Sequence, residues 1–146
     1  MSKSQLTLFK MGCYFAFITA ALHMFGHLSG PQLPTNDTER QLLDLMTNYK
    51  YAMPAGPGRS PMDFMNGFSL LFSLMTALTG GLGLIIARRA GDDVLLMLGT
   101  SRALAGAYVV SLAISLTYFF IVPTICLAAI ATCFAIASVR FARAAS

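Results

Sequence analysis

The chain has 146 residues, of which 56% are hydrophobic and only 11% are charged, whereas a soluble domain carries about a quarter charged residues. Charge this sparse excludes an ordinary soluble globular protein and predicts a single integral membrane domain over residues 1–146. The net charge of +4 does not indicate nucleic acid as a partner, because the basic residues flank apolar segments, where they set orientation in the lipid bilayer.

Four apolar segments are each long enough to cross a hydrocarbon core of about 30 Å as an α-helix. We expect these spans at residues 6–28, 62–87, 94–117 and 120–141. The sequence therefore predicts an all-α protein, a four-helix transmembrane bundle with a short extramembrane helix in its first loop.

The first loop, residues 29–61, is the only sizeable segment expected outside the membrane. Asn36 followed by Glu39 has the form of a capping box at a helix start, and the apolar residues that follow recur on one helical face. We expect a short helix over residues 37–50, lying on the mouth of the bundle or in the membrane interface.

The third and fourth spans form one long apolar run. Between residues 94 and 139 only Arg102 is charged, and this run is too long for a single crossing of the bilayer. We expect a break near residues 117–123, where the aromatic residues suit the membrane interface and Pro123 fits the first turn of a new helix.

The distribution of Lys and Arg predicts the orientation. With four spans, both termini and the middle loop share one side of the membrane, and that side holds Lys3, Lys10, Arg88, Arg89, Arg140 and Arg143. The other side holds Arg40, Lys50 and Arg59. Because the cytoplasmic side of membrane proteins is enriched in Lys and Arg, we expect both termini in the cytoplasm and the first loop outside.

Small residues predict which face of each span is buried, because they allow helices in a membrane to approach closely. The predicted faces, in the order of the spans, are Gly12, Ala16, Ala20, His23 and His27; Asp63, Asn66, Gly67, Ala77 and Gly81; Gly99, Arg102, Gly106 and Ala113; and Cys126, Ala129, Cys133 and Ala137. The unusual polar residues of the first three spans all belong to these faces.

His23 and His27 are the first candidates for a functional site. They are four residues apart, so both imidazoles project from the same side of one helix. That spacing suits a metal, a proton relay or a polar head group. Residue 24 is Met rather than Glu, so the HExxH zinc pattern is absent, and no metal site is predicted. The alternative is that His23 packs against a neighbouring helix while His27 sits at the interface.

Asp63 and Asn66 open the second span on the same outer side, level with the two histidines. A carboxylate near an imidazole would orient it. The alternative for Asp63 is a role in the helix start, because Ser60 suits the N-cap, Pro61 the first position, and Asp63 the first turn, where the helix dipole favours an acid.

Arg102 is the remaining candidate. It lies about 12 Å inside the third span, and an arginine within a membrane costs about 2.5–3.5 kcal/mol on insertion scales, which makes it a candidate for a functional site. The alternative is that its long side chain reaches back to the cytoplasmic head groups.

Two sequence patterns together carry a resemblance to known proteins. Residues Leu22-His23-Met24-Phe25-Gly26-His27 close the first span, and Phe64-Met65-Asn66-Gly67-Phe68-Ser69 open the second. These patterns resemble a group of uncharacterised four-span bacterial membrane proteins, and the layout is similar to that of DoxX-like proteins. The resemblance implies a helical bundle in the bacterial inner membrane.

Two functions remain open from the sequence. In the first, an apolar ligand such as a quinone, an isoprenoid or a lipid binds at a cluster of His23, His27, Asp63 and Asn66 near the outer face, or is acted on there. In the second, the protein is a non-catalytic accessory or structural subunit, with a membrane-protein partner or a second copy of the chain. No P-loop, GxSxG, CxxC or haem-attachment motif occurs, so no reaction and no cofactor is assigned.

Overall fold

The computed structural model describes residues 3–30, 33–90 and 92–145. These residues form five α-helices: α1 (Lys3–Leu28), α2 (Asp37–Asn48), α3 (Pro61–Arg89), α4 (Val94–Tyr118) and α5 (Ile121–Ala145). Four of them, α1, α3, α4 and α5, are long and apolar enough to cross a membrane. The predicted all-α fold with four spans and a short helix in the first loop is therefore confirmed.

The start of α3 is fixed by a capping box. The Ser60 hydroxyl accepts a hydrogen bond from the Asp63 N–H at 3.1 Å, and the Asp63 carboxylate accepts one from the Ser60 N–H at 2.9 Å. Pro61 occupies the first helical position, where its missing N–H costs nothing. The helix start predicted from these residues is confirmed.

The break between α4 and α5 also lies where the aromatic run predicts it. The helix α4 ends at Tyr118, and Pro123 stands in the first turn of α5. The two helices are joined across this tight hairpin by a buried hydrogen bond between the Ser115 and Thr124 hydroxyls, at 2.8 Å. Satisfying both hydroxyls in this way lets them lie inside the apolar hairpin.

The helix α2 begins as predicted and ends slightly earlier, at Asn48. The Asn36 side chain accepts a hydrogen bond from the Glu39 N–H at 2.9 Å. The Glu39 carboxylate accepts bonds from both the N–H and the hydroxyl of Thr35, at 2.6 and 2.8 Å, one residue earlier than in a standard capping box. The bond from the Thr35 backbone is the main reason why the pKa of Glu39 lies below its usual value of 4.5.

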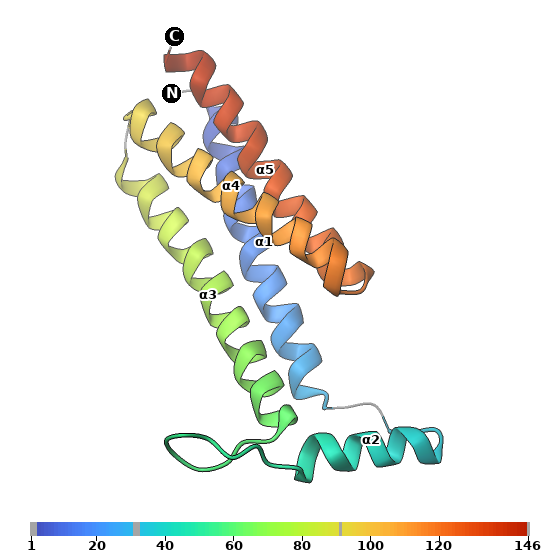
Figure 1. Ribbon diagram of the computed structural model, residues 1–146. Helices are drawn as coiled ribbons and strands as arrows, with labels where there is room; N and C mark the ends of the chain where they lie inside the picture. The colour runs from blue at the N-terminus through green and yellow to red at the C-terminus, as the bar shows by residue number, and fades with distance from the viewer. Residues whose placement is uncertain (1–2, 31–32, 91, 146) are drawn as a thin grey trace.

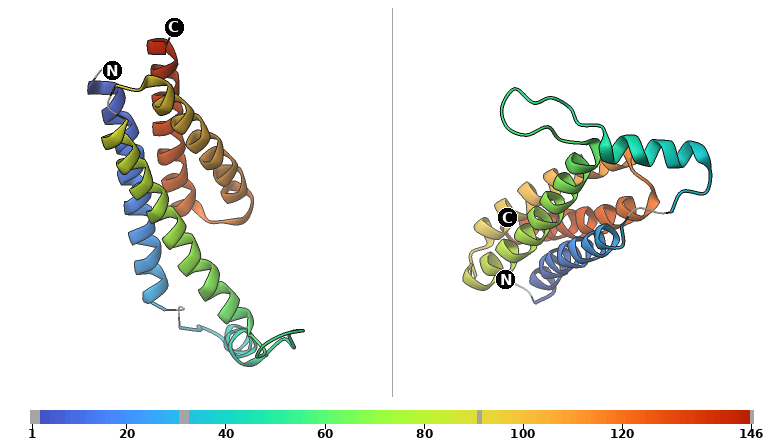
Figure 2. Two further views of the ribbon diagram at one scale, coloured as in Figure 1. Left: turned by 90° about the vertical axis from the view of Figure 1, so that its left-hand side faces the viewer. Right: turned by 90° about the horizontal axis from the view of Figure 1, so that it is seen from below.

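The four long helices are arranged in a row rather than in a closed square. The central helix α1 packs against α3 on one side and α5 on the other, α4 packs on α5, and α3 and α4 make only slight contact (Figures 1 and 2). Both chain ends lie at one end of the molecule, and α2 lies across the opposite end, where it contacts α3. The α4–α5 hairpin stops short of that end.

The core lies where α5 packs between α1 and α4, nearer the end that carries the termini. Phe9 contacts Phe134 edge-on, with ring centroids 5.4 Å apart, and Tyr108 stacks on Phe134 at 5.8 Å. Gly12 faces the same Phe134 ring so closely that a side chain there would collide with it. The Phe134 ring of α5 is thus accommodated by the absence of a side chain at Gly12 of α1.

The predicted buried faces of α1 and α5 are confirmed in the main. On α1, Gly12, Ala16 and Ala20 are buried and both histidines are half-buried. On α5, Cys133 and Ala137 are buried, whereas Cys126 and Ala129 are half-buried. Small residues therefore mark the packed side of the two helices that contact each other in the core.

The predicted face of α3 is wrong by about one residue of helical rotation. Asp63, Asn66 and Gly67 lie outside the buried set, and Ala77 and Gly81 are only half-buried. The buried residues are Ser73, Thr76, Gly80, Gly83 and Ala87. The buried side of α3 is set by its close approach to α1, where Gly80 and Gly83 face Cys13.

The predicted face of α4 points away from the core. None of Gly99, Arg102, Gly106 and Ala113 is buried. The buried residues of α4 are Met97, Leu98, Ser101, Tyr108 and Ser115. Because α4 packs almost entirely on α5, its rotation is set by the large side chains that fill the space beside the Phe134 ring and by the Ser115–Thr124 hydrogen bond, and not by its small residues.

Candidate functional site

His23 occupies the packed face of α1 near the C-terminal end of this helix. Its ring lies edge-on to Phe72 of α3, with ring centroids 4.8 Å apart and planes at 64°. The Nε2 atom is buried and has no hydrogen-bond partner among the described residues. Buried polar atoms are nearly always hydrogen-bonded, so this nitrogen is an exception that points to a missing partner.

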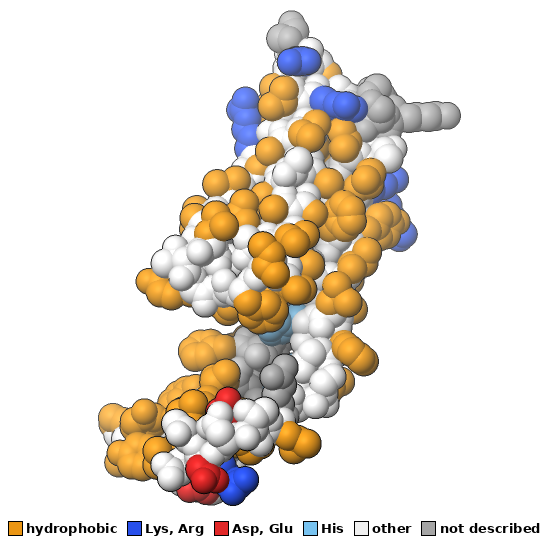
Figure 3. Space-filling view, turned by 90° about the vertical axis from the view of Figure 1, so that its right-hand side faces the viewer, with side chains coloured by type: hydrophobic (Ala, Val, Ile, Leu, Met, Phe, Trp, Pro, Cys, Tyr) orange, Lys and Arg blue, Asp and Glu red, His pale blue; other side chains and the backbone are white. Residues whose placement is uncertain are grey.

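The histidine lines a cavity of about 1080 Å³. Three parts of the chain form its wall: the C-terminal part of α1, the first half of α3, and the α4–α5 turn with the start of α5. Figure 3 shows this region as a deep notch in the surface, with histidine visible at its floor and hydrophobic side chains around it. His27 lines the same cavity one helical turn further out, so the two histidines share one site, as their spacing predicts.

The arrangement of the helices produces this cavity. The pair α1–α3 continues toward α2 after the α4–α5 hairpin has ended (Figure 1). Since α3 and α4 make only slight contact, the tip of the hairpin leaves a wedge between itself and the α1–α3 pair. Phe119 and Phe120 from this tip form one wall of the wedge, and His23 and Phe72 belong to the wall formed by α1 and α3.

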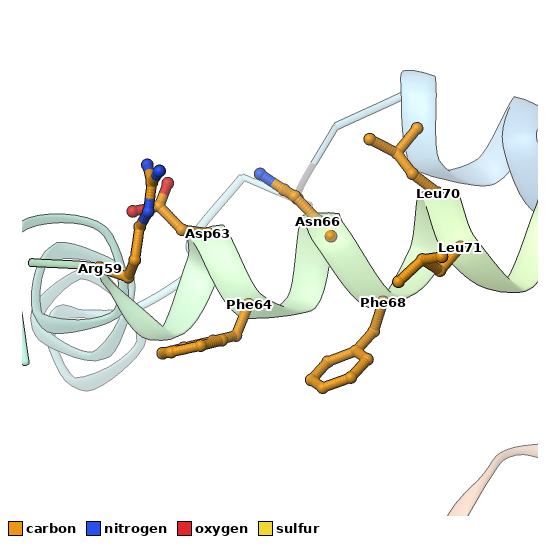
Figure 4. Close-up of a pocket in the computed structure, with 8 residues that line it drawn as sticks. Arg59, Asp63, Phe64, Asn66, Phe68, Leu70 and Leu71 are labelled. Atoms are coloured by element: carbon orange, nitrogen blue, oxygen red, sulfur yellow. The ribbon is translucent and has the colours of Figure 1, made fainter. Parts of the chain in front are cut away.

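Asp63 and Asn66 belong to a second, smaller hollow on α3, of about 470 Å³. Figure 4 shows their side chains projecting on the same side as Arg59, whereas Phe64 and Phe68 project on the other side of the helix. Phe68 and Leu71 line both hollows, but the histidines line only the larger one. The structure therefore keeps the predicted histidine pair together and places Asp63 and Asn66 apart from it.

The local bonds of Asp63 fit its role at the helix start. Its carboxylate accepts the Ser60 N–H, and Arg59 and Lys50 are the cations that interact with it electrostatically. Asp63 is thus held by the capping box and by two neighbouring positive charges of the first loop.

Arg102 is exposed on α4 and lines neither hollow. It lies eight positions after Val94, the first residue of α4, which is a depth of about 12 Å along the helix. Arg102 therefore shares neither hollow with the four other candidates.

Several residues of the larger cavity carry no signal that the sequence alone could reveal. Phe72 is one of many phenylalanines in the spans, and the sequence predicts only that Phe119, Phe120 and Pro123 mark a break between helices. Their approach to His23 depends on how the α4–α5 hairpin leans against α1, which is a property of the tertiary structure. Among the described residues, no three of His, Cys, Asp or Glu come together in an arrangement that would hold a metal ion.

Comparison of the chain with protein-family models, with curated proteins and with solved structures gave no match. The resemblance in layout to DoxX-like proteins stays a prediction.

Proposed function

We propose that this protein binds an apolar molecule of the bilayer, such as a quinone, an isoprenoid or a lipid, in the cavity beside His23. The observation that carries the proposal is that His23 lines a large cavity while its buried Nε2 atom has no hydrogen-bond partner among the described residues. Leaving a buried polar atom unpaired costs about 1–3 kcal/mol, and a ligand that supplies the hydrogen bond removes this cost.

The size and chemistry of the cavity support the same proposal. Small-molecule sites are clefts of about 300–1,000 Å³ that combine mostly apolar walls with a few polar groups. The cavity here has a volume of about 1080 Å³, and the aromatic rings of Phe72, Phe119 and Phe120 contribute to its wall. His27 adds a second polar group at the mouth. A long apolar body with one polar end fits this distribution.

We further propose that the protein resides in a bacterial inner membrane with both termini in the cytoplasm. The termini and the α3–α4 link lie at one end of the molecule (Figure 1). Arg88, Arg89, Arg140 and Arg143 belong to the final turns of α3 and α5, which point toward that end. An excess of Arg and Lys favours the cytoplasmic side. The cavity then opens toward the outer leaflet.

Native mass spectrometry of the protein released from lipid nanodiscs tests the binding function. We expect the wild-type protein to carry a small apolar adduct, and the His23→Ala variant to lose about tenfold in occupancy because the polar contact of the buried end is removed. Ile18→Ala is the matched control, since Ile18 lies on α1 and is 51% exposed but is not part of the cavity wall. Asp63→Asn is expected to leave the occupancy unchanged.

The second candidate function is that of an accessory or structural subunit, and the outer face of α4 favours it. Gly99 and Gly106 lie on this face with open space around them, and small residues on a membrane helix allow another helix to pack closely. Equal adduct occupancy in the wild type, His23→Ala and Ile18→Ala, at equal protein levels, would contradict the binding function and favour this candidate.

A further inference from the structure

We infer that the ligand of the His23 cavity is an uncharged amphiphile, which presents a hydroxyl or carbonyl oxygen to His23 and carries no phosphate or carboxylate. This inference rests on the proposed function and narrows its three ligand classes to their uncharged members. Polyprenols, prenylquinones and neutral lipids remain, whereas prenyl phosphates, fatty acids and phospholipids are excluded.

The first observation is the absence of charged side chains from the cavity wall. Among the described residues that line it there is no Asp, Glu, Lys or Arg. Proteins bind phosphates and carboxylates through Arg or Lys and through charge-assisted hydrogen bonds. Two cations of the first loop, Arg59 and Lys50, interact with Asp63 instead, and Arg102 lies outside the cavity. An anionic head group would therefore lose its hydration with no cation to replace it.

The second observation is that the partial charges of the two helix ends in the cavity wall have opposite signs. The first turn of α5, with Val122 and Pro123, contributes to the wall, and so does the last turn of α1, with Gly26 and His27. A helix start carries partial positive charge and a helix end partial negative charge. Pro123 also lacks one of the N–H groups that would bind an anion at the start of α5. The wall thus favours a dipolar group over an ion.

The third observation identifies the side chain of the cavity wall whose buried polar atom lacks a hydrogen-bond partner. Three buried side-chain atoms lack a hydrogen-bond partner in the described chain, namely His23 Nε2, Ser73 Oγ and Ser101 Oγ, and only His23 lines the cavity. An imidazole nitrogen forms a hydrogen bond with an uncharged hydroxyl or carbonyl group, and the other polar side chains of the wall, Thr19, His27 and Ser69, carry no carboxylate, ammonium or guanidinium group. The remainder of a ligand that enters the cavity meets mainly aromatic and aliphatic side chains.

A tryptophan reporter makes the inference testable, because the chain contains no Trp. The substitution Phe120→Trp places the only indole of the protein on the cavity wall, at a position that is 71% exposed. Tyr14→Trp is the matched control, at a 52% exposed position of α1 outside the cavity. In nanodiscs, a ubiquinone with a short saturated tail is expected to quench the indole emission of the Phe120→Trp variant at a lower quinone content than it quenches that of the Tyr14→Trp control.

Competition against this quinone then separates the ligand classes. The competitors are geranylgeraniol, geranylgeranyl phosphate and the saturated hydrocarbon phytane, which have similar chain lengths and differ in the polar end. We expect the alcohol to restore the emission of the Phe120→Trp variant. The phosphate should be weaker by about a hundredfold because its charge is not compensated, and the hydrocarbon should be weaker by about tenfold because His23 stays unpaired.

One outcome would overturn the uncharged ligand class, and another would overturn binding in the cavity. A phosphate that competes as well as the alcohol, or better, would overturn the uncharged class while leaving the cavity as a binding site. Equal quenching of the Phe120→Trp and Tyr14→Trp variants would overturn binding in the cavity itself and with it the proposed function.

The role of His23 is checked in the Phe120→Trp background. A further His23→Gln substitution keeps a hydrogen-bonding group and is expected to preserve the preference for alcohol over hydrocarbon, whereas His23→Ala is expected to abolish it. If the His23→Ala variant retains the full preference for alcohol over hydrocarbon, a group other than the imidazole must bind the polar end. That result would overturn the role of His23 in the inference.

Discussion

Cys13 lies at a point where α1 and α3 approach each other closely. A methyl group placed on Gly80 would come within 2.8 Å of the Cys13 carbonyl oxygen, and one placed on Gly83 within 2.6 Å of the Cys13 Sγ atom. Both glycines are buried. The contact between the two helices therefore requires the absence of side chains at these two positions, as is typical of helix pairs in membranes.

Replacement of these glycines by alanine is expected to destabilise the protein by about 1–3 kcal/mol, the usual cost of adding a methyl group to a packed core. At Gly80 the nearest obstacle is backbone, whereas at Gly83 it is a side-chain sulfur. Cys13→Ala should therefore rescue Gly83→Ala and not Gly80→Ala. Unfolding measured in detergent micelles gives the free energies. Gly67→Ala, in open space on the same helix, is the neutral control, and an equal loss in all three glycine variants would contradict this account.

The candidate residues differ in how far the sequence can place them. The pairing of His23 and His27 follows from their spacing on one helix, so it is predictable from the sequence alone. The local role of Asp63 is also predictable, because a capping box is made by residues close in sequence. The separation of Asp63 from the histidines is not, because it depends on the rotation of α3 about its axis relative to α1, and this rotation is set by the packing of Gly80 and Gly83 against Cys13.

At the scale of elements, α2 is held by bonds within its own start rather than by burial. None of its residues is buried, and the Glu39 carboxylate accepts two hydrogen bonds from Thr35. An acid whose pKa is lowered in the folded state stabilises the fold at pH values above its ordinary pKa, and this contribution is lost as the pH falls through the folded-state pKa. For Glu39 the ordinary value is 4.5, and the folded-state pKa lies below it.

We therefore expect the first turn of α2 to loosen as the pH falls below about 4.5 and to be unaffected between about pH 7 and about pH 5. A nitroxide spin label at the exposed position Gln41 reports this change as increased mobility in its electron paramagnetic resonance spectrum. In a Glu39→Gln variant the label should be more mobile at neutral pH and insensitive to acid. Identical pH profiles in the two proteins would rule out Glu39 as the cause.

The order of the helices and most of their limits are predictable, because length, hydropathy and caps are local properties. The rotation of α4 is not. Its small residues Gly99 and Gly106 predict a packed face, yet Tyr108 and Met97 are among the residues that are buried beside α5. A helix with one extensive neighbour has several possible packed faces, and the choice between them depends on the shape of that neighbour.

For the whole molecule, the even number of spans places both chain ends on one side. A cytoplasmic reporter enzyme fused after Ser146 should be active, and the same enzyme inserted at Gly56, in the exposed first loop, should be inactive, because the final turn of α5 and the loop that holds α2 lie at opposite ends of the molecule (Figure 1). If the reporter is inactive after Ser146 and active at Gly56, the protein still crosses the membrane four times, but in the orientation opposite to the proposed one. Activity at both sites would contradict four membrane crossings.

The short α4–α5 hairpin has a consequence for how a ligand reaches the site. Since the hairpin ends before α1 and α3 do, the notch faces sideways, and in the membrane placement proposed above it would be surrounded by lipid tails. A molecule dissolved in the leaflet can then enter by lateral diffusion without crossing water. Occupancy of the site is expected to follow the mole fraction of the ligand in the membrane, so that diluting the ligand with added lipid empties the cavity even when its total concentration in the sample is unchanged.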